Sequence, residues 1–218
     1  MTQFEMMGLP EKLVDRLKEL GITEPTPIQS HAIPIALDGG DVMGLAQTGS
    51  GKTAAFGLPL VTQMLAINSM PAPKSARGLV LAPTRELAKQ ISDTLTQLVQ
   101  KTPLKVALVV GGASINMQIK RLQRGTDLLV ATPGRLIDLL DRRALSLADT
   151  SFLVLDEADQ MLDLGFIHAL RRIASVLPAQ RQTMLFSATM PKQMNELAQS
   201  YLNNPKRVEV NPPGEAVD

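Results

Sequence analysis

Short apolar runs rich in Val and Leu alternate along this chain with longer amphipathic stretches. A strand of a parallel sheet is buried on both faces, whereas a helix that covers the sheet is apolar on one face only. The alternation therefore predicts an α/β fold, with helices on both faces of a mostly parallel, twisted sheet. We expect strands at residues 41–46, 78–82, 105–110, 127–131, 152–156, 183–187 and 207–210. We expect helices at residues 9–20, 28–37, 85–100, 114–124, 134–142, 166–177 and 192–202, and surface segments at 68–76 and 211–218.

Composition excludes several kinds of chemistry. The chain has 218 residues, 44% of them hydrophobic, which is enough for a substantial core. Its 22 Lys and Arg nearly balance 21 Asp and Glu, so net charge gives no argument for nucleic-acid binding. The lack of Cys excludes thiolate catalysis, and two isolated histidines make a zinc site unexpected. No apolar run is long enough to cross a bilayer, and we expect a cytoplasmic protein without membrane partners.

One segment between a predicted strand and a helical stretch has the residues of a phosphate-binding loop. Gly49 and Gly51 let backbone N–H groups converge at a helix N-terminus, which carries roughly half a positive charge. Lys52 can reach the β- and γ-phosphates of a nucleotide, and Thr53 offers a hydroxyl to Mg²⁺. A plain Gly/Ser loop before a capped helix is the alternative. The whole loop comprises Ala46, which stands where the usual pattern has its first glycine, and Gln47, Thr48, Gly49, Ser50, Gly51, Lys52 and Thr53.

A second acidic segment follows another apolar run. Asp156 comes at the end of the strand predicted for residues 152–156, where a carboxylate can hold the Mg²⁺ that Thr53 also contacts. Glu157 follows and can orient or deprotonate a water that attacks the γ-phosphate. The alternative is that the two acids only cap the next helix. We assign catalytic roles to Lys52, Asp156 and Glu157.

These segments resemble the DEAD-box RNA helicases, whose signature is the run Asp156-Glu157-Ala158-Asp159. The other family motifs occur in the family's order. Residues 46–53 resemble motif I, 83–88 motif Ia, 111–112 the GG motif, 132–135 motif Ib and 187–189 motif III. The resemblance covers nearly the whole chain and implies the first RecA-like P-loop NTPase domain of such a helicase. It divides the chain into an N-terminal Q-motif region at 1–38, a RecA-like core at 39–210 and the start of an interdomain linker at 211–218.

The resemblance also implies the nucleotide. Residues 21–29 are similar to the Q motif, in which the glutamine, here Gln29, recognises adenine. A carboxamide has a donor and an acceptor side by side, which matches adenine N6 and N7 and predicts ATP with Mg²⁺. Phe4 stands where the family has an aromatic residue that stacks on the base. Its alternative role is hydrophobic packing against the first helix.

For RNA, the resemblance implies contacts through backbone N–H groups, small hydroxyls and two arginines, which bind phosphates without reading bases. Contacts to the 2′-OH would explain a preference for RNA. Ser187, Thr189 and Asp159 are implied to couple the nucleotide to the RNA. The implied RNA-binding residues are Pro83, Thr84, Arg85, Gly111, Gly112, Thr132, Gly134 and Arg135.

Family members have a second RecA-like domain, which supplies further arginines to the γ-phosphate, and nothing after Thr189 resembles it. We therefore expect this chain to be the amino-terminal half of a helicase, with weak ATP binding, slow hydrolysis and no unwinding by itself. Three other functions stay open. They are a non-catalytic, ATP-gated module that binds RNA or protein, a small-molecule kinase with the same phosphate loop, and a DNA helicase of related architecture.

Overall fold

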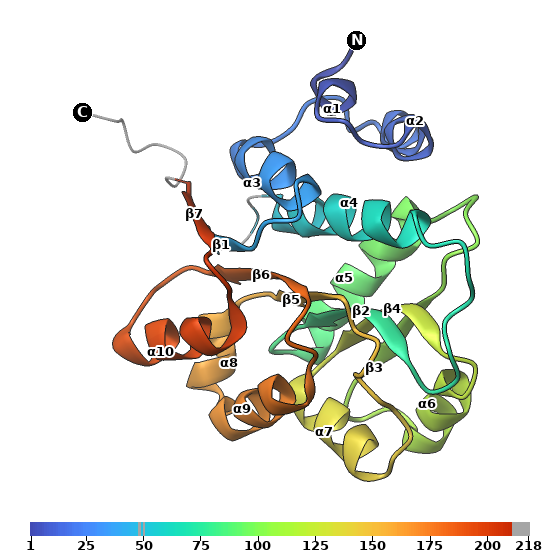
Figure 1. Cartoon of the computed structure of the whole chain (residues 1–218), viewed down its shortest axis with the longest axis vertical. Coiled ribbons are helices and arrows are strands. Elements are labelled where there is room, and N and C mark those ends of the chain that lie inside the picture. Colours follow the sequence, from blue (N-terminus) through green and yellow to red (C-terminus); the bar gives the residue numbers. More distant parts are fainter. Residues whose placement is uncertain (48, 50, 211–218) are drawn as a thin grey trace.

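Seven parallel strands form a single sheet in the described part of the chain, which comprises residues 1–47, 49 and 51–210 of a computed structural model (Figure 1). Their order across the sheet is β3-β4-β2-β5-β6-β1-β7. The predicted α/β fold is confirmed. The strands are β1 Val42–Leu45, β2 Ala76–Leu81, β3 Val106–Val109, β4 Thr126–Ala131, β5 Phe152–Leu155, β6 Gln182–Ser187 and β7 Lys206–Glu209.

Helices cover both faces of this sheet (Figure 1). One face packs against α3 Pro27–Leu37, α4 Lys52–Leu65 and α5 Arg85–Leu98, and two N-terminal helices, α1 Gln3–Met6 and α2 Glu11–Glu19, add to the same core. The other face packs against α6 Ile115–Leu122, α7 Pro133–Asp141, α8 Ala158–Asp163, α9 Ile167–Val176 and α10 Lys192–Tyr201.

The central strand β5 explains why the strand sequences are apolar throughout. Phe152 and Val154 belong to the core beneath α3, α4 and α5, whereas Leu153 and Leu155 belong to the core on the other face. All four side chains are fully buried. Because successive side chains of a strand point to opposite faces, a strand with helices on both sides needs an apolar residue at every position.

Some local features differ from the expectations. β2 begins at Ala76, two residues earlier than predicted, because Ser75 already pairs with Ser146 in a parallel bridge. The predicted surface segment 68–76 therefore ends inside the sheet. The sequence predicts no bounds for the short helices α1 and α8, since four and six residues are too few to show a helical period. It predicts α4 only as a helix that starts after the phosphate loop, without an end, whereas the structure extends it to Leu65.

The parallel arrangement brings the motif segments to one edge of the sheet. β1, β2, β4, β5 and β6 all run in one direction, and each is followed directly by one of the motif segments. In open parallel sheets, ligands bind at this carboxyl edge. The fold therefore places these motif segments along one edge, although they are spread over residues 46–189 of the sequence.

Candidate active site and nucleic-acid interface

The phosphate loop connects β1 to α4. Gly49 and Gly51 have φ values of +83° and +86°, in the left-handed region that glycine adopts without strain. α4 begins at Lys52, so the unpaired N–H groups of its first turn lie next to the loop. The N–H of Ala46 donates to the carbonyl oxygen of Ser187 at 3.1 Å, which fixes the start of the loop to β6.

Lys52 connects this loop to the acidic pair at the end of β5. Its Nζ lies 3.2 Å from Asp156 Oδ1 and 3.9 Å from Glu157 Oε1. Lys52 and Asp156 are both buried, so water screens their attraction only weakly. Burial raises the pKa of the Asp156 carboxyl, and the charge of Lys52 opposes that rise. Residues from two distant motifs thus form one charged cluster.

Glu157 has a strained backbone, with a φ of +50° in the left-handed region. It occupies the N-cap position of α8, and its N–H donates to Asp156 Oδ1 at 3.0 Å. The turn gives two neighbouring acids different surroundings, because Asp156 is buried and Glu157 is half-buried. Such a difference suits one carboxylate that holds a metal ion and another that acts on water.

The residues present fit a Mg²⁺ ion that comes with a nucleotide. Mg²⁺ is commonly held by one or two carboxylates together with phosphate oxygens and water. Asp156 supplies one carboxylate, and Thr53 adds a hydroxyl in the half-buried first turn of α4. The described residues contain no group of three or more acidic, His or Cys side chains that could hold a metal alone. Of the other loop residues, Gln47 is exposed, and Thr48 and Ser50 lie outside the described residues.

Gln29 is joined directly to the phosphate loop. Its Nε2 donates to the carbonyl oxygen of Gly51 at 3.0 Å, and its Oε1 accepts from the N–H of Thr26 at 3.0 Å. A Cβ on Gly51 would lie only 2.7 Å from Gln29 Nε2, so the close approach requires glycine. The carboxamide keeps one N–H and one lone pair for another partner. Recognition of adenine by Gln29 stays a prediction, now with a physical link to the phosphates.

Phe4 is buried among the N-terminal helices, and its role in base stacking stays a prediction. Its side chain is 1% exposed and packs in the core that includes Leu13 and Leu17 of α2. A ring must present a face to stack on a base, and this arrangement covers it. The structure therefore favours the alternative role of Phe4 as a packing residue of the N-terminal helices.

The implied RNA-binding residues come together in one open groove of about 560 Å³. It lies where β2 and β4 end and where α5 and α7 begin. The first turns of α5 and α7 point unpaired N–H groups toward it, which favours an anionic ligand. The groove is lined by Pro83, Thr84, Arg85, Glu86, Gly111, Gly112, Thr132, Gly134, Arg135, Asp138 and Phe166.

Both arginines of the groove are held by backbone carbonyls. Arg85 Nη1 donates to the carbonyl oxygen of Gly111 at 3.4 Å. Arg135 Nη1 donates to the carbonyl oxygen of Ala113 at 3.0 Å and to Gln118 Oε1 at 2.9 Å. Neither arginine forms an ion pair with a carboxylate in the described part of the chain. Their charges therefore remain available to phosphates.

Comparison with known proteins agrees with this geometry. The profile of the DEAD/DEAH box helicase family matches residues 26–197. The chain belongs to this family. It is 42% identical over 210 residues to the ATP-dependent RNA helicase CshA of Listeria monocytogenes, a match that covers 96% of this chain and 39% of CshA. It also superposes with a TM-score of 0.87 on the crystal structure of a DEAD box protein from the hyperthermophile Methanococcus jannaschii, with 34% identity, covering 95% of this chain and 56% of that one.

The chain thus spans about two fifths of the length of CshA and just over half of the solved DEAD box protein. No helix in the part that the structure describes is long and apolar enough to span a membrane.

A hydrogen-bonded connection joins the acidic motif of this DEAD/DEAH box domain to the segment after β6. Asp159 Oδ2 accepts from the N–H and the hydroxyl of Thr189, at 3.2 and 3.0 Å. The hydroxyl of Ser187 donates to the carbonyl oxygen of Thr189 at 2.6 Å. Ser187 therefore shapes the turn that presents Thr189 to Asp159. A role of this contact in coupling ATP to RNA stays a prediction.

Three residues of the groove were missed from the sequence. Asp138 lies one helical turn after Gly134, so the helical period could have found it, whereas Glu86 could have been found only because it lies inside the motif segment 83–88. Phe166 precedes α9, and nothing in the sequence relates it to the other lining residues. The two carboxylates repel phosphates but can accept a hydrogen bond from a ribose hydroxyl.

Gly112 offers a direct test of the groove. It has a φ of +79°, and a Cβ there would lie 2.0 Å from Arg85 Nη1. We expect Gly112→Ala to displace Arg85 and to weaken binding of a single-stranded RNA homopolymer about tenfold, the effect of one charge-assisted contact. The control is Gly39→Ala, because Gly39 has a φ of +88°, close to that of Gly112, a Cβ there meets nothing within 4 Å, and Gly39 does not line the groove. Fluorescence anisotropy measures both affinities, and equal losses in the two variants would contradict the role of Arg85.

Proposed function

We propose that this chain is the ATP-binding module of an ATP-dependent RNA helicase. The proposal rests chiefly on one observation. The cluster of Lys52, Asp156 and Glu157 and the groove of about 560 Å³ lie at the same carboxyl edge of one sheet. A site for triphosphate and a site for a nucleic-acid backbone are thereby carried on adjacent strands, β5 and β2.

In this proposal Lys52 exchanges partners when ATP binds. Without phosphates its ammonium group is balanced by Asp156 at 3.2 Å. The β- and γ-phosphates offer a stronger negative charge, and the departure of Lys52 leaves the Asp156 carboxylate to hold Mg²⁺ together with Thr53. When bound, the ion neutralises charge on the triphosphate. Glu157 orients the attacking water and takes its proton, and its half-buried position gives it access to that water.

RNA is proposed to bind the groove through its sugar-phosphate backbone. Arg85, Arg135 and the N-termini of α5 and α7 favour phosphates, whereas Glu86 and Asp138 suit ribose 2′-hydroxyls. This mixture of cations and carboxylates supports RNA over DNA, which has no 2′-hydroxyl to donate. The lining contains one aromatic residue, Phe166, so the groove binds backbone rather than a stack of bases.

Unwinding belongs to the whole protein. We propose that a second RecA-like domain, with arginines for the γ-phosphate, closes on this domain over ATP and RNA in the cytoplasm. Arginines of that kind accelerate related phosphate-loop enzymes about 10³- to 10⁵-fold, so the present chain alone should bind ATP weakly and hydrolyse it slowly.

A comparison of homopolymers tests the function. In the whole helicase, we expect poly(U) RNA to stimulate ATP hydrolysis at least tenfold and poly(dT) to have little effect, because only RNA satisfies Glu86 and Asp138. Release of inorganic phosphate measures both rates. Equal stimulation by DNA would favour the DNA-helicase alternative, and RNA binding that ignores ATP would favour a non-catalytic module.

A further inference from the structure

A second hollow lies at the opposite edge of the sheet, away from the nucleotide and the RNA groove. Its volume is about 370 Å³. It is formed by the segments that precede β2 and β5, where Ser75 pairs with Ser146, and by the ends of α7 and α9. It is lined by Lys74, Leu140, Arg143, Leu145, Ser146, Leu147, Ala148, Arg172 and Val176. None of these residues has a role in the function proposed above.

The centre of this amino-edge hollow is apolar. Leu145 and Leu147 are anchored in the core and contribute to its floor. Leu140 is half-buried, and Val176 at the end of α9 is 47% exposed. All four side chains are aliphatic, so they can pack against an inserted aliphatic side chain, but they offer no ring on which a base could stack.

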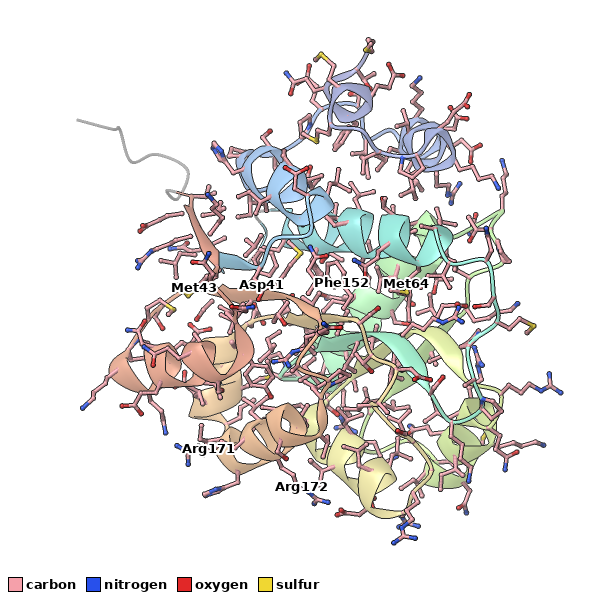
Figure 2. The ribbon with its side chains drawn as sticks, in the orientation of Figure 1. Asp41, Met43, Met64, Phe152, Arg171 and Arg172 are labelled. Atoms are coloured by element: carbon pink, nitrogen blue, oxygen red, sulfur yellow. The ribbon has the colours of Figure 1, made fainter. Side chains whose placement is uncertain are left out.

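The hollow also carries a net positive charge. Arg172 is paired with Asp141 of α7, but Lys74 and Arg143 are exposed and form no ion pair with any residue that the structure describes. Figure 2 shows Arg172 on α9, on the side of the sheet away from α3 and α4. Two unpaired cations beside an aliphatic floor favour a ligand that combines carboxylates with apolar groups.

The backbone at both cations is unusual. Lys74 and Arg143 have φ values of +57° and +54°, in the left-handed region where glycine is less strained. Hydrogen bonds fix both turns, since Lys74 donates its N–H to the carbonyl oxygen of Leu122 at 3.1 Å and Arg143 donates to that of Leu140 at 3.0 Å. Two positions in this hollow thus carry charged side chains, although their backbone conformation favours glycine. Strain of this kind is more common where a side chain has a function.

We propose that this hollow binds a short acidic peptide segment of a partner protein. One or two aliphatic side chains of the peptide occupy the floor at Leu145 and Leu147, and flanking Asp or Glu residues pair with Lys74 and Arg143. Such a partner leaves the carboxyl edge free, because α7 begins at the RNA groove and reaches the hollow only at its other end. The domain can hold the partner while it binds ATP and RNA.

The test uses a fluorescein-labelled ten-residue peptide in which Leu alternates with Asp and Glu, titrated into the 218-residue chain. The variant is Lys74→Gly combined with Arg143→Gly. It removes both charges and relieves both left-handed positions, so we expect its Tm to rise by roughly 2 °C or more while peptide affinity falls at least tenfold. The control combines Arg171→Ala with Lys192→Ala, which removes two exposed positive charges outside the hollow. We expect it to bind the peptide within twofold of the unmodified chain.

Two further probes separate this site from simple charge attraction and from RNA binding. A peptide with Ser in place of every Leu, and a poly(U) oligonucleotide, are titrated into the same three proteins. The Ser peptide is expected to bind at least tenfold more weakly, and poly(U) affinity is expected to be unchanged by the double glycine variant. The proposal is overturned if the Leu peptide does not bind, if its affinity is unchanged in that variant, if the Ser peptide binds as well, or if the variant weakens poly(U) instead.

Discussion

Replacing Glu157 by Gln in the whole helicase is expected to lower ATP turnover about 10²- to 10⁴-fold, the usual contribution of a general base. ATP affinity should change little. Gln has the same shape and still accepts a hydrogen bond, but it cannot take a proton from water. In the proposed function, nucleotide binding depends instead on Lys52 and the α4 N-terminus. Lys52 is closer to Asp156, at 3.2 Å, than to Glu157, at 3.9 Å.

The two quantities are measured separately, turnover by phosphate release with saturating RNA and affinity by titration with a fluorescent ATP analogue. Glu196→Gln is the matched control, because Glu196 is an exposed residue of α10 that does not line the groove. Unchanged turnover in Glu157→Gln would refute the assigned role. A loss of ATP affinity as large as the loss of turnover would instead indicate that Glu157 acts by positioning Lys52.

The sequence predicts best where one physical requirement acts on every residue of an element. β5 is an example, because helices on both faces demand an apolar side chain at all four of its positions. The glycines of the phosphate loop are predictable for a different reason, since a turn that brings backbone N–H groups together needs glycine, and Gly49 and Gly51 both have positive φ values. The order of the strands across the sheet has no comparable local signal. It depends on how the two cores pack as a whole, and only the structure gives it.

The residues of the candidate sites show the same difference between a local sequence signal and the packing of the whole domain. Arg85 and Arg135 could be predicted because each belongs to a short motif, whereas Phe166 reaches the groove only through the packing of α9. Phe4 is a residue for which the sequence and the structure point to different roles. Its place in the sequence suggests base stacking, but the short helix α1, fixed by a capping box between Thr2 and Glu5, directs its ring into the core. A helix of four residues is too short for its sequence pattern to predict which way the Phe4 side chain points.

Gly125→Ala is expected to cause the largest loss of stability. Gly125 has a φ of +73°, and a Cβ there would lie 2.2 Å from the carbonyl oxygen of Ala72. The obstacle is backbone, which cannot rotate away as a flexible side chain can. A left-handed residue with a Cβ costs about 1–2 kcal/mol, and the overlap adds about 1–3 kcal/mol, so we expect the free energy of unfolding to fall by about 3 kcal/mol.

Gly39→Ala separates these two contributions, because Gly39 has a φ of +88° but nothing within 4 Å of its Cβ position. In Gly39→Ala, the free energy of unfolding should therefore fall only by the conformational contribution, about 1 kcal/mol. Urea unfolding followed by circular dichroism measures this change. Equal losses in the two variants would mean that the backbone around Ala72 shifts without any loss of stability.

The segment around Ala72 continues into Lys74, whose N–H donates to the carbonyl oxygen of Leu122, three residues before Gly125. A rigid contact at Gly125 therefore also holds one of the two cations of the amino-edge hollow, and Gly125→Ala should weaken binding of the acidic Leu peptide where Gly39→Ala does not.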